Sequence, residues 1–243
     1  MLLDERAPAV APPVTIKRPR YGPLKNPVLL SVRNYKQHFP INKSLTVHAV
    51  NGISFDLRKG EIFGLVGESG CGKSTLARLM LGLARPTEGS VRFKGEEYPE
   101  PRSAMARAAS GRTDDLPGPF SCFDERMSVV DQVAEPSWCT EGSSKDEALA
   151  KLLPCCALRA SRTPRKKLPG VMSGGQLQRA AIARAIALRP ALLVCDEPVA
   201  SLDVSIQAQV LELLNELKRT TRMAMLFVSH NLNVVRYICD RVA

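Results

Sequence analysis

A glycine-rich segment with a single lysine is the part of this 243-residue sequence that points most directly to chemistry. Its residues are Gly67, Glu68, Ser69, Gly70, Cys71, Gly72, Lys73, Ser74 and Thr75. Glycines let backbone N–H groups approach phosphate oxygens closely, because no Cβ stands in the way. The Lys73 ammonium can reach the outer phosphates of ATP, and the Ser74 hydroxyl can bind Mg²⁺. The segment therefore predicts an ATP site with Mg²⁺.

The residues on either side of this phosphate loop have the patterns that such a loop requires. Residues 62–66 form a short apolar run, which predicts a buried strand, and residues 74–83 place apolar side chains on one face of a helix. The helix would add its positive N-terminal dipole to the site. The alternative is a glycine-rich turn with a chance lysine, and the strand–loop–helix order makes it minor.

Two carboxylates and a histidine follow later apolar runs. Asp196 and Glu197 come directly after residues 191–195, which predict a strand buried on both faces of a parallel sheet. Because nucleotides bind at the carboxyl ends of such strands, we expect Asp196 to hold Mg²⁺ and Glu197 to act as general base toward water. His230 follows residues 223–228 and can hydrogen-bond the γ-phosphate. Taken alone, a surface acidic pair and a structural histidine are the alternatives.

A fourth segment begins an alanine-rich helix predicted over residues 176–188. It consists of Ser173, Gly174, Gly175 and Gln176. Ser173 is suited to be the N-cap, and the glycines leave N–H groups open to an anion. This helix has no phosphate loop of its own, so its anion would have to come from elsewhere.

The order of the predicted elements favours an α/β core. Strands are predicted over residues 28–32, 50–57, 62–66, 191–195 and 223–228, and helices over residues 74–83, 145–153, 176–188, 205–219 and 232–238. Residues 1–27 are proline-rich and predict a disordered leader. One nucleotide-binding domain is predicted over residues 28–243, with a mostly helical insert over about 99–172.

Composition narrows the class of protein. No run of 18 apolar residues exists, so no membrane-spanning helix is predicted, and the N-terminus lacks the order of a signal peptide. The seven cysteines form no CxxC pair, so neither a zinc site nor a disulfide framework is predicted. The net charge is +10, but the sequence has no motif of the kind that reads the grooves of nucleic acids, so nucleic-acid binding is not expected.

Taken in this order, the four segments resemble the nucleotide-binding domains of ABC transporters. Residues 172–176 are similar to the family signature, with Met172 in place of leucine, and Ser201, Leu202 and Asp203 are similar to its D-loop. The resemblance implies a P-loop NTPase core with an antiparallel β subdomain and a helical insert. It also implies that two such domains face head to tail, so that the signature of one closes on ATP held by the other.

The resemblance narrows to the peptide-importer branch, which handles di- and oligopeptides and has nickel-importing relatives. The similar segments are residues 67–78, 196–199, 201–210, 234–238 and 240–243. Phe39 occupies the place of the aromatic residue that stacks on adenine in that branch, and Tyr35 is the competing candidate. The resemblance implies ATP hydrolysis that energises peptide import at the cytoplasmic face of the bacterial inner membrane. The implied partners are a second, non-identical ATP-binding subunit, two membrane permease subunits and, indirectly, a periplasmic solute-binding protein.

The sequence departs from the family pattern where the Q-loop should lie. The residues aligned with its Phe-Gln-Asp-Pro are Leu116, Pro117, Gly118 and Pro119, so a proline replaces the glutamine that would contact Mg²⁺ and water. Gln132 lies too far along the chain to replace it. Read one base later, codons for residues 115–119 can encode Thr-Phe-Gln-Asp-Pro. This suggests a short out-of-frame segment within residues 99–125, and resequencing would decide it.

Three interpretations stay open at this stage. The first is the ATPase of a peptide importer, or of a nickel or other-solute importer in the same branch. The second is a non-transport ABC ATPase, although such proteins usually show two cassettes or a long coiled coil. The third is a degenerate chain that binds ATP with impaired hydrolysis or coupling. Pro117, and an end at Ala243 where the branch continues into a further strand, would explain it.

Overall fold

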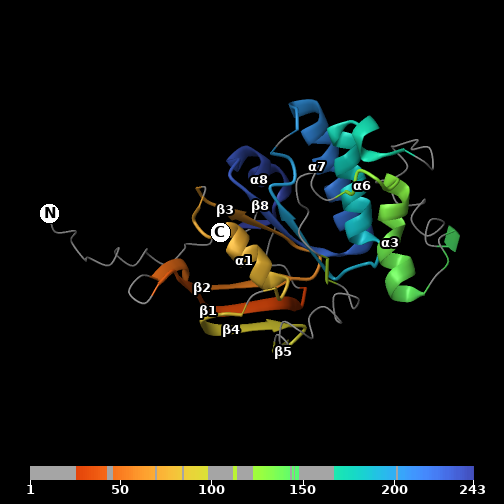
Figure 1. Ribbon diagram of the computed structural model, residues 1–243. Helices are drawn as coiled ribbons and strands as arrows, with labels where there is room; N and C mark the ends of the chain where they lie inside the picture. The colour runs from red at the N-terminus through yellow and green to blue at the C-terminus, as the bar shows by residue number, and fades with distance from the viewer. Residues whose placement is uncertain are drawn as a thin grey trace.

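The computed structural model describes two sheets and the helices that pack on them (Figure 1). The described residues are 26–42, 46–68, 70–83, 85–97, 112–113, 123–142, 144, 146–147, 167–200 and 202–243. Most of the predicted leader and much of the predicted insert lie outside these ranges, so both stay predictions.

The first sheet is antiparallel, with strand order β2-β1-β4-β5. Its strands are β1 (Val28–Pro40), β2 (Thr46–Arg58), β4 (Glu88–Phe93) and β5 (Glu96–Glu97). Buried and exposed residues alternate along much of these strands, as expected when one face of a sheet packs on a core. β1 and β2 extend beyond the predicted ranges, because pairing with a partner strand supports residues whose own strand pattern is weak.

The second sheet is parallel, with strand order β6-β7-β8-β3-β9. Its strands are β3 (Ile62–Val66), β6 (Arg112–Thr113), β7 (Leu192–Asp196), β8 (Ala224–Ser229) and β9 (Arg241–Val242). The three predicted buried strands are confirmed to within one residue at each end. In the ladder Val66 pairs with Ser229, and Asp196 pairs with Val228. The carboxyl ends of β3, β8 and β7 therefore meet at one edge of the sheet.

Helices cover both faces of the parallel sheet. They are α1 (Lys73–Met80), α3 (Val129–Glu141), the short 3₁₀ helix η1 (Pro169–Val171), α6 (Gly174–Ile186), α7 (Val204–Thr221) and α8 (Leu232–Ile238). α1 lies between the two sheets, whereas α6, α7 and α8 lie on the opposite face (Figure 1). Across the described residues, no helix combines the length and the apolar character needed to cross a bilayer.

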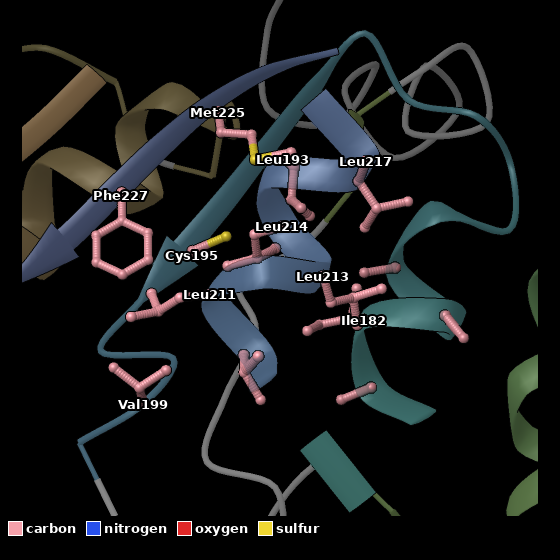
Figure 2. Close-up of a cluster of buried hydrophobic side chains, with 14 of the residues drawn as sticks. Ile182, Leu193, Cys195, Val199, Leu211, Leu213, Leu214, Leu217, Met225 and Phe227 are labelled. Atoms are coloured by element: carbon pink, nitrogen blue, oxygen red, sulfur yellow. The ribbon is translucent and has the colours of Figure 1, made fainter. Parts of the chain in front are cut away.

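The strands of the parallel sheet supply two cores, one on each face. Leu192 and Val194 belong to the core beneath α1 and the antiparallel sheet. Leu193 and Cys195, the alternate residues of the same strand, pack into the core beneath α6 and α7 (Figure 2). A strand that is buried on both faces must be apolar at every position, which is why β7 reads as a continuous apolar run.

α3 lies within the insert that was predicted to be mostly helical, but its own range was not predicted. Pro136 lies inside it, and a proline in a helix interior removes a backbone hydrogen bond, so local propensity disfavours a helix there. The helix begins at the Ser128 cap, whose hydroxyl accepts from the Asp131 N–H. Of the helix predicted over 145–153, only residues 146–147 are described, and they are helical.

A buried ion pair ties the antiparallel sheet to the end of the chain. The Arg241 guanidinium lies 2.9 Å from the fully buried Glu61 carboxylate and also donates to the Asp56 carbonyl. Burial raises the pKa of Glu61 from its usual value, and the Arg58 N–H and Arg241 oppose that rise. The carboxylate therefore depends on these two partners to remain charged inside the protein.

Replacement of Arg241 by alanine is expected to lower the free energy of unfolding by about 3–5 kcal/mol, because it leaves a buried carboxylate without its cation. The loss should shrink as the pH falls, since a folded state with a raised Glu61 pKa binds a proton before the unfolded state does. Urea unfolding at several pH values measures both effects. Arg92→Ala is the control, because the exposed Arg92–Glu97 pair at 3.9 Å should contribute less than about 1 kcal/mol. Equal losses for the two variants would contradict the prediction.

Candidate nucleotide-binding site

A cavity of about 810 Å³ lies where the carboxyl ends of the parallel strands meet the antiparallel sheet. It is lined by Val47, His48, Ala49, Glu68, Gly70, Cys71, Gly72, Lys73, Ser74, Thr75, Asp196, Glu197 and His230. The structure thus brings the predicted phosphate loop together with the predicted acidic pair and histidine, although they lie far apart in the sequence. Ser69, also predicted, lies outside the described residues.

The phosphate loop holds its lysine through main-chain oxygens. The Lys73 ammonium donates to the carbonyls of Gly67 and Glu68, at 2.8 and 2.6 Å, and lies 3.8 Å from the Cys71 sulfur. The carbonyls of the loop therefore point toward the cation, at the first residue of α1. A negatively charged ligand can compete for the same ammonium, because a charged acceptor forms a stronger hydrogen bond than a neutral one.

Gly72 is required where it lies, because its backbone is left-handed and its α-carbon faces another strand. Its φ is +94°, and a Cβ added there would lie 2.2 Å from the carbonyl oxygen of Ala49. Ala49 is an extra residue in β2, since Gln37 pairs with Val50 while His38 pairs with His48. This β-bulge turns the edge of β2 toward the loop, as bulges beside functional sites commonly do.

The acidic pair follows β7 at the edge where nucleotides were expected. Glu197 has a φ of +50°, an unfavourable value for a residue with a Cβ, and its N–H donates to the Val228 carbonyl at 3.0 Å. Strained backbone of this kind is characteristic of functional positions. The ring Nδ1 of His230 lies 2.8 Å from Glu197 Oε1. The two residues predicted to be catalytic are thus in contact, and their roles stay predictions.

The other carboxylate oxygen, Glu197 Oε2, is buried and has no hydrogen-bond partner among the described residues. A buried acceptor without a partner carries a desolvation cost, so it is suited to a water or another donor from the ligand. Ser74 and Asp196 line the same cavity and offer the oxygen ligands that Mg²⁺ prefers. The residues therefore fit a nucleotide bound with Mg²⁺.

The predicted signature segment does not line this cavity. Ser173 caps α6, as predicted, and it forms a capping box in which its hydroxyl accepts from the Gln176 N–H and its own N–H donates to the Gln176 side chain. Gly175 packs against Ile206 of α7, and a Cβ there would lie 2.5 Å from that side chain. Ser173, Gly174, Gly175 and Gln176 thus lie outside the cavity of their own chain, and their role as a signature stays a prediction.

Asp203 is the N-cap of α7. Its carboxylate accepts from the Ile206 N–H and the Ser205 hydroxyl, which together lower the pKa of Asp203 below its usual value. Like the signature segment, Asp203 does not line the cavity. Its D-loop role stays a prediction, and the structure assigns it a helix cap in addition.

Of the two aromatic residues proposed for adenine, Tyr35 is wrong, whereas Phe39 stays a prediction. Tyr35 is fully buried in the core, where its hydroxyl donates to Gln37 and burial raises its pKa to about 12, so it cannot stack on a ligand. Phe39 is 44% exposed and does not line the described cavity. Val47 and His48 line the cavity, and no local sequence pattern pointed to them, because pairing between β1 and β2 places them there.

Gln132 has a structural role in the described residues. Its side chain is buried and bonds the main chain of the preceding loop, accepting from the Asp124 N–H and donating to the carbonyls of Asp124 and Met127. This arrangement supports the prediction that Gln132 does not replace the missing Q-loop glutamine. Pro117 lies outside the described residues.

Comparison with known proteins relates this site to one family. The ABC transporter family pattern matches residues 50–200. The oligopeptide transport ATP-binding protein AppF of Bacillus subtilis (strain 168) is 41% identical, over 88% of this chain and 68% of that protein. The di/tripeptide transport ATP-binding protein DppF of Pseudomonas aeruginosa (strain UCBPP-PA14) and the oligopeptide transport ATP-binding protein OppF of Escherichia coli (strain K12) are each 38% identical with the same coverage.

Solved structures show the same fold. The dimeric structure of MJ0796, a bacterial ABC transporter cassette, has a TM-score of 0.78 at 23% identity and covers 88% of this chain and 93% of that one. A dimeric post-hydrolysis state of that cassette, bound to ADP and Pi, gives a TM-score of 0.76 at 22% identity with the same coverage. At these identities the likeness concerns the fold alone, and it agrees with the predicted α/β core and antiparallel subdomain.

Proposed function

Because this chain belongs to the ABC transporter family, we propose that it is the ATP-hydrolysing subunit of a membrane complex that imports peptides. The observation that carries the proposal is the cavity in which the phosphate loop, the acidic pair and His230 converge. The names of the relatives, which are oligopeptide and di/tripeptide transport ATP-binding proteins, support peptides as the solute.

The loop would bind the phosphates of ATP. Backbone N–H groups of Gly70, Gly72 and the first turn of α1 lie at the cavity, where the helix dipole favours negative charge. The Lys73 ammonium would exchange the carbonyls of Gly67 and Glu68 for phosphate oxygens, which offer it a negative rather than a neutral acceptor. Binding is therefore expected to change the contacts of the lysine first.

Glu197 would act as the general base toward the attacking water. Its Oε1 is held by His230, which fixes the orientation of the carboxylate and leaves Oε2 for the water. Ser74 and Asp196 would hold Mg²⁺, which when bound supplies positive charge that offsets charge on the phosphate oxygens. His230, 64% exposed at its side chain, can also reach toward the outermost phosphate.

A second subunit would complete the site. The N-terminus of α6, with its glycine N–H groups, does not line the cavity of its own chain, so we infer that it faces the ATP of a partner, together with Asp203. The partner is proposed to be a non-identical sister. Two permease subunits would place the pair peripherally at the cytoplasmic face of the inner membrane, and a periplasmic protein would deliver the peptide.

The purified full chain is expected to bind ATP in equilibrium dialysis with Mg²⁺ present. Combined in vesicles with its sister subunit, its permeases and the binding protein, it should hydrolyse ATP faster when peptide is supplied, because hydrolysis is coupled to import. Labelled peptide inside the vesicles measures the transport. Nickel and a sugar are the control solutes. A chain that binds no ATP contradicts the site, whereas hydrolysis coupled to a control solute contradicts the peptide assignment alone.

A further inference from the structure

Two histidines on neighbouring strands of the antiparallel sheet bring their rings together. The sequence has three histidines in all, and His38 of β1 pairs with His48 of β2 in the ladder. The two imidazole ring centroids lie 4.0 Å apart, with the ring planes tilted by 49°. Strand pairing, rather than a local spacing motif, creates this contact. Because imidazole is the commonest metal ligand among side chains, two of them in contact form a candidate metal site.

The backbone around His38 favours a close approach of the two side chains. The His38 N–H donates to the Thr87 hydroxyl at 3.0 Å, and Thr87 directly precedes β4. This N–H therefore points away from β2, so His38 and His48 form a non-hydrogen-bonded pair of the antiparallel ladder. Side chains lie closer together in such pairs, with α-carbons about 4.5 Å apart. The sheet thus holds the two imidazoles side by side before any ligand binds.

One ring nitrogen of His38 lacks a partner. His38 Nε2 is buried, and it forms no hydrogen bond within the part of the chain that the structure describes. A buried polar nitrogen without a partner carries a desolvation cost. A metal ion would remove that cost, because the neutral imidazole nitrogen offers its lone pair to the ion. His48 is exposed and lines the cavity, so an ion can reach the pair from that side.

The separation of the rings agrees with the binding of one ion by both. Zn²⁺ binds imidazole nitrogen at about 2.0–2.1 Å, so two nitrogens on one tetrahedral ion lie roughly 3.3 Å apart. Rings whose centroids are 4.0 Å apart can present two nitrogens at that distance after small rotations of the side chains. Among the described residues no group of three or more histidine, cysteine or carboxylate side chains could hold a metal ion, so water would complete the coordination.

The charges around the pair also favour a cation. Lys36 holds the pKa of the exposed Glu88 carboxyl below its usual value, and His38 adds to the same shift, so Glu88 and His38 interact. On the other side, the cavity that His48 lines carries three carboxylates and one lysine. Negative charge on both sides of the imidazoles stabilises a cation bound between them.

We propose that His38 and His48 form a site for a divalent transition-metal ion such as Zn²⁺ at the edge of the cavity. Imidazole suits Zn²⁺, Cu²⁺ and Ni²⁺, whereas Mg²⁺ and Ca²⁺ prefer oxygen ligands. The site is therefore separate from the Mg²⁺ site proposed at Ser74 and Asp196, and it requires no nucleotide. Its affinity should follow the general order for such ligands, with Cu²⁺ bound more tightly than Zn²⁺ and Mn²⁺ bound weakly.

The test measures Zn²⁺ binding by the full chain, prepared without a histidine tag. Competition with a chromophoric chelator gives the affinity in excess Mg²⁺, which occupies oxygen sites, and without nucleotide. His38→Gln and His48→Gln should each weaken the binding of one Zn²⁺ at least about 10-fold, because even the loss of a residue that orients a metal ligand costs that much. His230→Gln, which removes the remaining histidine of the sequence, is the matched control and should bind Zn²⁺ as the wild type does.

Thermal unfolding provides a second measurement that also checks the fold. His48 is exposed, so His48→Gln should keep the wild-type melting temperature in the absence of metal. Zn²⁺ should then raise the melting temperature of the wild type, because it binds the folded state, and raise that of His48→Gln much less.

Four results would overturn the assignment. Zn²⁺ affinity that is unchanged in either His38→Gln or His48→Gln would show that the two rings do not share an ion. An equal loss of affinity in His230→Gln would place the ion beside Glu197 instead. Displacement of Zn²⁺ by Mg²⁺ would indicate oxygen rather than nitrogen ligands. Wild-type protein that binds no Zn²⁺ would exclude the site, whereas none of these results bears on ATP binding.

Discussion

Replacement of Glu197 by glutamine is expected to lower the rate of ATP hydrolysis by roughly 10²- to 10⁴-fold, the usual contribution of a general base, while ATP still binds. The amide has nearly the shape of the carboxylate and can still bond His230, but it cannot take a proton from water. Phosphate binding rests on the loop and on Lys73, which the substitution does not touch. Phosphate release assays and ATP dialysis on the same preparation measure the two effects separately.

The control for this prediction is Glu212→Gln. Glu212 is an exposed carboxylate of α7, 3.6 Å from Arg219, and does not line the cavity. The substitution Glu212→Gln removes one negative charge, as Glu197→Gln does, but at a position away from the cavity. Hydrolysis should therefore stay at the wild-type rate. Substantial hydrolysis by Glu197→Gln would refute the general-base role. A parallel loss of ATP binding would show that the carboxylate organises the whole pocket.

The chemistry of the site could be predicted from the sequence because it is local. A phosphate loop needs consecutive backbone N–H groups and one lysine, and these lie within nine consecutive residues, Gly67 to Thr75. The acidic pair could be placed in the same way, because a continuous apolar run implies a strand buried on both faces, and residues after such a strand lie at the binding edge. Both expectations depend on neighbours in the chain rather than on distant contacts.

The residues that β2 contributes to the cavity lining, Val47, His48 and Ala49, could not be predicted, because long-range pairing places them there. Val47 and His48 reach the cavity only through the register with β1 and the bulge at Ala49, which no local pattern encodes. The register between β1 and β2 also places Tyr35 in the core, whereas the family resemblance had left it as the competing candidate for the adenine contact. The bounds of α3 escaped prediction for a different reason, since tertiary packing keeps Pro136 within a helix that its own propensity opposes.

Substitution of Gly72 by alanine is expected to weaken ATP binding by at least about 100-fold, as misplacing reacting or binding groups by roughly 1 Å commonly does. The new Cβ would lie 2.2 Å from the Ala49 carbonyl oxygen, a backbone atom that cannot rotate away. Either the loop moves off β2 or β2 shifts outward, and both changes displace the N–H groups that should face phosphate. Dialysis with ATP and Mg²⁺ measures the loss.

A matched glycine separates this clash from backbone strain. Gly95 has a φ of +87°, close to the +94° of Gly72, but a Cβ there meets nothing within 4 Å. Each alanine variant should lose roughly 1–2 kcal/mol in the free energy of unfolding, because a residue with a Cβ is strained in the left-handed conformation. Only Gly72→Ala should also lose ATP affinity, because only there does the methyl group meet the neighbouring strand. Comparable ATP binding by the two variants would mean that contact between β2 and the phosphate loop does not shape the site.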